Sequence, residues 1–266
     1  MCLRLASLAF LLSVCFPDLS AAQQTSSITV QRDQQALTVL AQVLKTAGGE
    51  AAINAIRDIT ASGTITYYWA GEEVQGTVTV KGRGTSQFRL DATLAKGVRS
   101  WTVNNGIGSI KEPDGTTTPI EHHNTVNAGN LTFPLAHLVA ALQDSSTAIL
   151  YIGLETREGQ QVHHLREWKA YSPDSDPSGM RSRLTRKDFF VDPDKFVVVG
   201  ILDMLHPKNR SNQDSPHEVR FSDYRLTNGV LVPFSITEIG VGQRISTIQF
   251  SQITFNSDLR DTDFDL

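Results

Sequence analysis

The sequence predicts a mainly β protein with some α-helix (α+β), built on one large, strongly curved antiparallel sheet with two or three helices against its concave side. From Ile59 onwards, apolar and polar residues alternate with the two-residue period of half-buried strands. Turn dipeptides such as Asn105-Gly106 and Asn228-Gly229 separate these runs at hairpin spacing. Helical periodicity is limited to three short segments, which argues against a doubly wound parallel sheet.

The first helix is expected over residues 33–46, where apolar residues recur at helical spacing from Leu37 to Leu44. Asp33 can cap its first turn, and Gly48-Gly49 stops it. A second, short helix is expected over residues 50–57. A third, over residues 131–143, interrupts the strands.

About a dozen strands are expected, beginning with a meander from residue 59 to the turn at Asp114-Gly115. After the third helix the predicted strands are 149–157 with 162–170, 184–191 with 196–203, 219–226 with 230–238, and 244–255. Two polar loops, 172–182 and 207–216, lie between them. No linker divides the chain after the N-terminal segment, so residues 23–266 are predicted to form a single domain.

The N-terminal residues have the order of a secretory signal peptide. Arg4 precedes a mostly apolar run over residues 5–16, which is too short to span a bilayer. Ser20-Ala21-Ala22 then provides small residues before a cut, so residues 1–22 are predicted to be removed and the mature protein to start at Gln23. The expected location is therefore the periplasm. An alternative cut makes Cys15 an acylated first residue and the protein lipid-anchored.

Composition excludes several classes of site. The chain has 24 Lys and Arg against 28 Asp and Glu, a net charge of −4, and no basic run, so nucleic acid is not an expected partner. Its two cysteines, Cys2 and Cys15, both lie in the signal region. The mature protein therefore has no cysteine for a disulfide, a thiolate metal site or a nucleophile.

The motifs of catalysis and of cofactor binding are missing. No Gly-x-Ser-x-Gly element occurs, and Gly82-Arg83-Gly84 lacks the third glycine of a phosphate loop, since Gln87 occupies that position. The pairs His122-His123 and His163-His164 are adjacent, and neighbours in a strand point to opposite faces. The histidines are therefore expected at the surface or at strand ends. No metal, nucleotide or other cofactor and no enzymatic activity is predicted, and a hydrolase with an unrecognised site is the third alternative.

Aromatic residues are the remaining candidates for a functional site. A dozen strands need a second layer on their inner face, and only two or three helices can supply it. The predicted lining of an apolar cavity is Tyr67, Trp69, Phe88, Trp101 and Phe196. The alternative is that these side chains simply fill the core.

Several stretches, taken in order, resemble the LolA-like superfamily of periplasmic outer-membrane lipoprotein carriers and lipoprotein-sorting proteins. They are Gly48-Gly49 with Ala52, Ile53, Ile56, Ile59 and Gly63; Phe189-Phe190-Val191-Asp192-Pro193; Tyr224 with Asn228-Gly229-Val230 and Val232-Pro233; and Phe250, Ile253, Phe255-Asn256, Leu259 and Phe264. The resemblance implies an unclosed β-barrel, covered by helices, around a hydrophobic cavity that accepts acyl chains.

The same resemblance implies a non-enzymatic binding or carrier protein of the cell envelope. Its expected partners are the acyl chains of lipids or lipoproteins, with envelope membrane proteins as further candidates and no nucleotide. The alternative function is an interaction or sensor domain whose cavity is filled by its own side chains.

Overall fold

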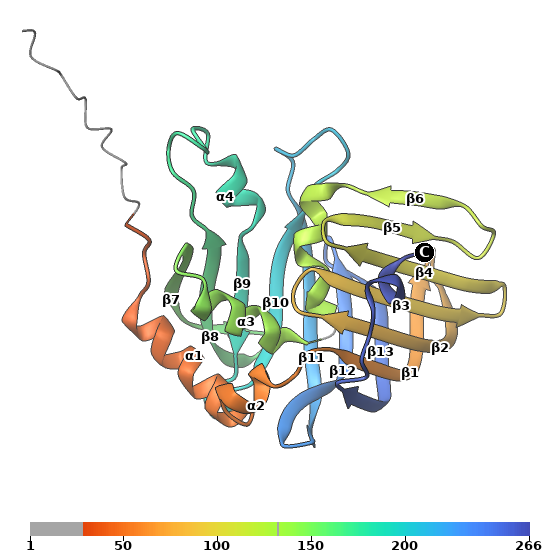
Figure 1. Cartoon of the computed structure of the whole chain (residues 1–266), viewed down its shortest axis with the longest axis horizontal. Coiled ribbons are helices and arrows are strands. Elements are labelled where there is room, and N and C mark those ends of the chain that lie inside the picture. Colours follow the sequence, from red (N-terminus) through yellow and green to blue (C-terminus); the bar gives the residue numbers. More distant parts are fainter. Residues whose placement is uncertain (1–28, 132) are drawn as a thin grey trace, which may run out of the picture.

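The computed structural model describes residues 29–131 and 133–266 (Figure 1). The predicted signal peptide, including Cys15, lies outside the described residues. The described strands are β1 (Ile59–Trp69), β2 (Glu72–Arg83), β3 (Gln87–Leu94), β4 (Gly97–Asn104), β5 (Ile107–Lys111), β6 (Thr117–Ile120), β7 (Thr147–Arg157), β8 (Gln160–Lys169), β9 (Lys187–Val191), β10 (Val198–Leu205), β11 (Ser215–Thr227), β12 (Val230–Gly240) and β13 (Gln243–Phe255).

All of these strands belong to one antiparallel sheet. Each strand pairs with its neighbours in sequence, except that β6 and β7 do not pair with each other and form the two free edges. In addition, β13 pairs with β1. The sheet is therefore open between β6 and β7. Figure 1 shows that the strands of the β2–β6 half run across those of the β8–β12 half, so the sheet is strongly curved. The predicted fold class, a large curved antiparallel sheet in the form of an unclosed barrel, is confirmed.

The helices largely follow the prediction. They are α1 (Gln34–Thr46), α2 (Glu50–Asn54), α3 (Pro134–Gln143) and α4 (Met180–Leu184), with 3₁₀ turns η1 (His122–Leu131) and η2 (Asp261–Phe264). Asp33 caps α1 by accepting the backbone N–H of Gln35 at 2.9 Å.

The short helix α4 differs from the prediction, which had a loop to residue 182 and a strand from residue 184. The carboxylate of Asp176 accepts the backbone N–H groups of Arg181 (3.0 Å) and Ser182 (2.9 Å). These hydrogen bonds satisfy donors in the first turn of the helix, so the strand starts only at Lys187. A hydrogen bond between the Asp176 side chain and the backbone five or six residues later leaves no periodic pattern in the sequence.

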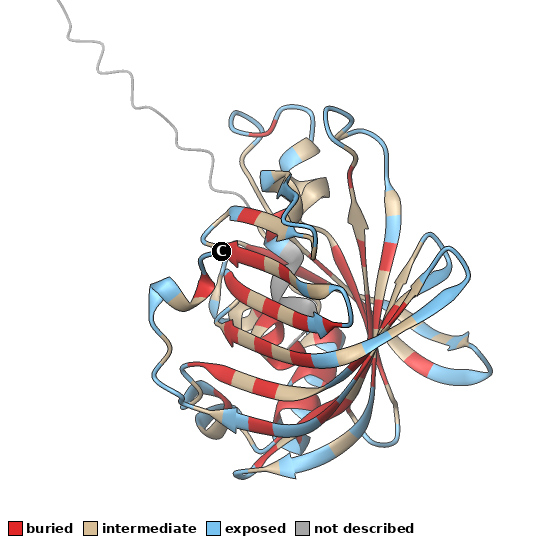
Figure 2. Cartoon of the chain, turned by 90° about the vertical axis from the view of Figure 1, so that its right-hand side faces the viewer, coloured by how far each residue is buried: buried red, intermediate tan, exposed pale blue. Residues whose placement is uncertain are grey.

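The hydrophobic core lies between the inner face of the sheet and the helices. Strand residues alternate in burial, as Figure 2 shows by its red and tan bands. Ile65, Val80, Leu165 and Ile201 face inward and are almost fully buried. The helices add the apolar side chains Val39, Leu40, Val43 and Leu44 of α1 and Leu135 and Leu138 of α3 to the same core. The helices thus supply the second layer that the sheet requires.

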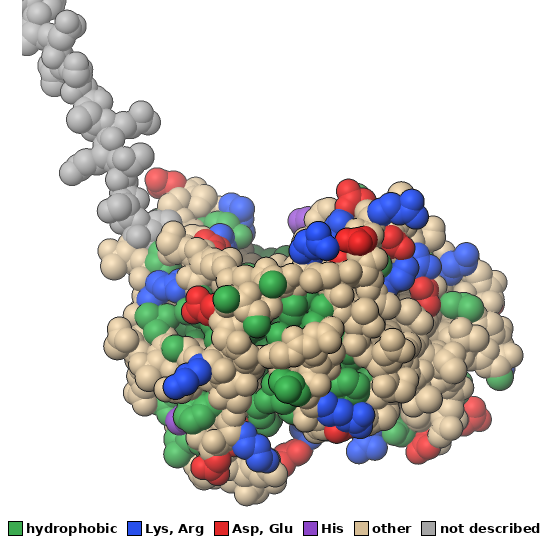
Figure 3. All heavy atoms as spheres, turned by 60° about the horizontal axis from the view of Figure 1, so that its bottom comes forward, with side chains coloured by type: hydrophobic (Ala, Val, Ile, Leu, Met, Phe, Trp, Pro, Cys, Tyr) green, Lys and Arg blue, Asp and Glu red, His purple; other side chains and the backbone are tan. Residues whose placement is uncertain are grey.

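Exposed apolar side chains are found mainly at hairpin ends. Ile107 follows the β4–β5 turn, Leu226 precedes the β11–β12 turn, and Val241 lies in the β12–β13 turn. On the face seen in Figure 3, hydrophobic side chains gather between groups of charged ones. The single apolar residues at the hairpin ends are normal on protein surfaces.

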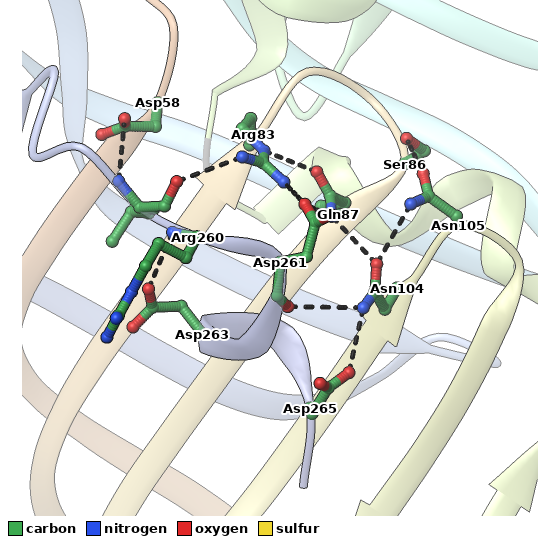
Figure 4. Close-up of polar contacts among 11 residues, drawn as sticks. Asp58, Arg83, Ser86, Gln87, Asn104, Asn105, Arg260, Asp261, Asp263 and Asp265 are labelled. Atoms are coloured by element: carbon green, nitrogen blue, oxygen red, sulfur yellow. Dashed lines mark hydrogen bonds and ion pairs between the residues drawn. The ribbon is translucent and has the colours of Figure 1, made fainter.

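The C-terminal strap, residues 257–266, crosses the outer face of β2–β4 (Figure 4). Arg83 forms an ion pair with Asp261 and donates to the carbonyl of Leu259 at 3.1 Å. Asn104 donates to Asp265 at 2.9 Å, and Phe264 is buried beneath the guanidinium of Arg83. The strap therefore covers the outside of the sheet and leaves its inner face to the core and to the cavity described below.

Gly48 is the tightest point between α1 and the sheet. Gly48 has a φ of +118°, and a Cβ added to it would lie 2.4 Å from the carbonyl oxygen of Gly229. A Cβ added to Gly49 would meet nothing within 4 Å. The carbonyl of Ala47 accepts the N–H of Leu231 at 3.0 Å, which holds the helix end on the β11–β12 hairpin. The resemblance motifs Gly48-Gly49 and Asn228-Gly229 therefore meet in space.

Gly48→Ala is expected to lower the free energy of unfolding by about 3 kcal/mol, because it adds a backbone clash to the cost of a positive φ. Gly49→Ala carries only the cost of its positive φ, about 1 kcal/mol. Urea unfolding of both variants at pH 7 measures the difference. Equal losses in the two variants would show that the helix end is not held tightly on the hairpin.

Candidate functional site

A cavity of about 440 Å³ lies on the inner face, between the β1–β6 half of the sheet and strands β10–β13. This volume is within the range of small-molecule sites, about 300–1,000 Å³. Aromatic and aliphatic side chains form most of its wall, and a few ionisable groups form one end. The wall includes Tyr67, Trp69, Leu90, Trp101, Ile110 and Ile120.

The aromatic wall is built by the alternation of β1 and β4. Tyr67 and Trp69 lie two residues apart on β1, so both face inward, and their rings stack with centroids 4.5 Å apart and planes at 16°. Arg99 of β4 lies over both rings, with its guanidinium carbon 5.2 Å from the Tyr67 centroid and 5.8 Å from that of Trp69. Its Nε donates to both oxygens of Glu112 at 3.2 Å. The arginine therefore stiffens the wall and is itself neutralised.

The polar floor of the cavity consists of Asp203, His217, Glu238 and Ser246. The sheet register aligns Asp203 with His217 and Glu238 with Ser246 on neighbouring strands. His217 Nδ1 lies 2.7 Å from Asp203 Oδ1, and its Nε2 lies 3.1 Å from Glu238 Oε1. Ser246 donates to the other oxygen of Glu238 at 2.9 Å. Both ring nitrogens thus face carboxylates, which is the arrangement that favours an imidazolium.

The protonation of this floor follows from its contacts. Burial disfavours the charged form of His217, but hydrogen bonds to Asp203 and Glu238 outweigh burial and raise the pKa of His217 to about 10. Burial likewise opposes ionisation of Glu238, yet the hydrogen bond from His217 brings the pKa of that carboxyl below its ordinary value. At neutral pH the floor therefore holds the His217 imidazolium beside the Glu238 carboxylate.

A second buried ion pair lies on the same face of the sheet, nearer α3. Glu167 and Lys187 are 3.7 Å apart, and burial raises the pKa of the Glu167 carboxyl against the opposing charge of Lys187. His137 of α3 is fully buried, and this burial, with Lys187 nearby, holds its pKa well below the ordinary value. His137 is therefore neutral.

Three of the five predicted cavity residues line this cavity: Tyr67, Trp69 and Trp101. Phe88 is fully buried behind Trp101, edge-to-face with ring centroids 5.1 Å apart. Phe196 lies in the β9–β10 turn at a φ of +50° and stacks on His163. Neither of these two phenylalanines is among the residues that line the cavity. Both contribute to the core instead, because one is covered by its cross-strand neighbours and the other lies outside a strand.

The sequence analysis missed the ionisable residues of the polar floor. Its expectation that histidines lie at the surface or at strand ends is wrong for His217, which is 4% exposed. A signal was present, since the inward-facing series of three strands each end in an ionisable residue. These series are Ile201 to Asp203, Val219 to His217, and Ile236 to Glu238. Following each alternation to the next inward-facing position, two residues along the strand, identifies all three ionisable residues.

The pair His163-His164 behaves as the alternation of a strand predicts, whereas His122-His123 lies in the 3₁₀ turn η1 and not in a strand. His163 lies 2.9 Å from the hydroxyl of Tyr151, and His164, its neighbour on the opposite face, lies 3.1 Å from Glu155. Within residues 29–131 and 133–266, His, Asp and Glu side chains form no group of three or more suited to a metal ion. Among the helices of the same residues, none has the length and apolarity needed to cross a membrane.

A larger hollow, about 820 Å³, lies on the outer face of the sheet around β8–β11. Its charged groups pair with one another: Glu218 accepts from Arg157 at 3.1 Å and from Arg220 at 2.9 Å. The guanidinium of Arg157 also lies 3.8 Å from the ring centroid of Phe190. This surface satisfies its own polar groups, so the smaller inner cavity is the better candidate site.

Comparisons with known proteins identify the fold. No protein-family model and no curated protein matches the chain. Among solved structures, an outer membrane lipoprotein-sorting protein domain from Vibrio parahaemolyticus has a TM-score of 0.51 and 11% identity, covering 87% of this chain and 96% of that one. A LolA superfamily protein from Nitrosomonas europaea has a TM-score of 0.50 and 14% identity, covering 85% and 97%. The open thirteen-stranded sheet of the described residues, with its helices, therefore has the LolA-like fold, as the order of the sequence motifs predicted.

Proposed function

We propose that this chain is a non-enzymatic binding or carrier protein of the cell envelope, whose inner cavity receives acyl chains of a lipid or lipoprotein. The observation that carries the proposal is the aromatic-walled cavity on the inner face of a LolA-like sheet. The similar proteins are a lipoprotein-sorting domain and a LolA superfamily protein, which supports a ligand of this class.

The energetics of such a site come from burial. Each methylene withdrawn from water contributes about 0.8 kcal/mol, and no directional bond is needed along the chain. Trp69, stacked on the buried ring of Tyr67, offers an apolar contact surface that is already ordered before a ligand enters. An alkyl chain is therefore the ligand portion that this wall suits best.

His217 and Ser246 of the polar floor are not arranged as a general base and a nucleophile. His217 carries a proton on each ring nitrogen, and both protons are directed to carboxylates, so it is unable to act as a base. The hydroxyl of Ser246 donates a hydrogen bond to Glu238. Within the described residues, this hydroxyl is not hydrogen-bonded to an imidazole nitrogen. A binding function is therefore favoured over a hydrolase.

The proposal includes export to the periplasm, with the mature protein starting at Gln23 and a form anchored through Cys15 as the alternative. The order of Arg4, the apolar run and Ser20-Ala21-Ala22 supports it. Intact-mass measurement of the protein from a periplasmic fraction distinguishes the two cuts. A retained Met1 would contradict export.

The experiment for the binding function combines extraction and substitution. Organic extraction of the purified protein, followed by mass spectrometry, is expected to release acyl-containing molecules. Trp69→Ala is expected to weaken the binding of an added fluorescent fatty acid by about tenfold or more, since it removes one ring of the stacked wall. The matched control is Trp168→Ala, because Trp168 does not line this cavity. No acyl chain in the extract and no binding by the wild type would favour an interaction domain with a self-filled core.

A further inference from the structure

Three residues that line the inner cavity each carry a buried polar atom without a hydrogen-bonding partner in the described chain. These atoms are Trp101 Nε1, Asp203 Oδ2 and His206 Nδ1. Buried polar atoms in folded proteins are nearly always hydrogen-bonded. By contrast, none of the residues lining the larger outer hollow has such an atom. Three of them around one cavity point to partners supplied by a ligand.

Asp203 offers an acceptor. Its side chain is fully buried on the inner face of β10, and its Oδ1 is already taken by His217 at 2.7 Å. The second oxygen, Oδ2, retains its lone pairs. An ionised carboxylate oxygen accepts hydrogen bonds and donates none, so its missing partner must be a donor.

His206 offers a second acceptor. Its Nε2 lies 3.0 Å from Asp214, so this nitrogen carries the ring proton. Burial, assisted by the charges of Arg183 and His123 and opposed by Asp214, lowers the pKa of His206, so the ring is neutral at pH 7. Its Nδ1 therefore presents a lone pair. Two hydrogen bonds with Asn124, one given by the main-chain N–H and one accepted by the carbonyl of His206, hold the residue in position.

Trp101 offers the only donor of the three, because an indole N–H cannot accept. The floor and rim thus present two acceptors and one donor. The charges around them disfavour an anion, because Asp203 and Glu238 outnumber the His217 imidazolium and Arg99 is already bound to Glu112. The lining also includes one further charge of each sign, the exposed Lys208 and the half-buried Glu121.

We infer that the polar end of this cavity recognises an uncharged head group that donates two hydrogen bonds and accepts one, as a primary acyl amide or a monoacylglycerol does. Asp203 Oδ2 and His206 Nδ1 accept the two hydrogen bonds that the head group donates, and Trp101 Nε1 donates one to the head-group oxygen. The inference rests on the proposed function, since the aromatic wall holds the alkyl chain. A carboxylate or phosphate head brings only acceptors and a negative charge, so a ligand with such a head is bound more weakly, through its alkyl chain alone.

The test uses four ligands with one alkyl chain and different heads, measured at pH 8 by displacement of the hydrocarbon fluorophore diphenylhexatriene. Oleamide and monooleoylglycerol donate hydrogen bonds, methyl oleate only accepts them, and oleate is an anion. The two donors are expected to bind about tenfold or more tightly than methyl oleate, as expected for hydrogen bonds to buried groups. Oleate is expected to bind weakest. A preference for oleamide indicates a primary amide head group, and a preference for monooleoylglycerol indicates a free glycerolipid.

Two variants assign the effect to the floor. Asp203→Asn keeps an oxygen for His217 and replaces the free acceptor by an amide donor, so it is expected to reduce oleamide affinity about tenfold and to leave methyl oleate unchanged. Trp101→Phe removes the N–H together with part of the apolar ring, so it is expected to lower oleamide affinity several-fold more than methyl oleate affinity. This comparison serves as a second test should Asp203→Asn not fold. The control is Asp188→Asn, a buried carboxylate on the outer face that binds Arg166 at 2.6 and 2.8 Å.

The outcomes separate the two claims. Equal affinities for oleamide and methyl oleate in the wild type, or tighter binding of oleate, overturn the head-group inference while leaving an acyl-binding cavity intact. The same holds if a folded variant keeps the full oleamide preference. Failure of all four ligands to displace the fluorophore overturns the proposed function and the inference with it.

Discussion

Replacing His217 by alanine is expected to lower the free energy of unfolding by about 3–5 kcal/mol at pH 7, because it leaves two buried carboxylates without their shared cation. Asp203 loses the partner at 2.7 Å and Glu238 the partner at 3.1 Å, and both carboxylates line the inner face of the sheet. Urea unfolding of the variant and the wild type measures the loss. The control is His122→Ala, since His122 is exposed and its ring is hydrogen-bonded to the carbonyl of Gly106.

The dependence of this loss on pH is a second readout of the same prediction. The folded-state pKa of His217 is about 10, above its ordinary value of 6.5, so the folded protein holds the extra proton. Its stabilisation is complete below about pH 6.5 and is lost as the pH rises to 10, by up to about 1.4 kcal/mol per pH unit. The difference between wild type and variant should shrink across this window. A difference that stays constant from pH 6.5 to 10 would mean that His217 is neutral in the folded protein.

Phe88→Ala is expected to cost about 3–5 kcal/mol, whereas Trp101→Ala should cost clearly less despite the larger side chain removed. Phe88 is enclosed on every side and leaves a cavity when truncated. Trp101 is only partly buried and already borders an open cavity, so fewer packing contacts are lost. Denaturant melts of both variants, with binding of the fluorescent fatty acid to the folded protein, provide the comparison.

The pattern of the two readouts distinguishes a wall residue from a core residue. Trp101→Ala should reduce binding while the protein remains stable, and Phe88→Ala should reduce stability while the surviving folded fraction still binds. If Trp101→Ala instead costs as much stability as Phe88→Ala and binding is unchanged, the cavity is filled by the protein itself. That result would favour the interaction domain over the carrier.

Local sequence was a good guide to the elements and to the inward face of each strand. The alternation around Tyr67 and Trp69 and around Trp101 predicted that these rings face inward, and the cavity includes all three. The cap at Asp33 and the stop at Gly48-Gly49 predicted α1 to within a residue. These features depend on backbone periodicity and turn chemistry over a few residues, which a sequence expresses directly.

The sequence by itself determined the class of fold, because period-two strands with short hairpins permit little besides an antiparallel meander. Only the tertiary structure decided which side chains share the cavity. Asp203, His217 and Glu238 come from three strands and meet through cross-strand register. Phe88 is more buried than Trp101, because Trp101 covers Phe88 and itself borders the cavity. Register and curvature depend on contacts between distant residues, such as the pairing of β1 with β13, and no local period encodes them.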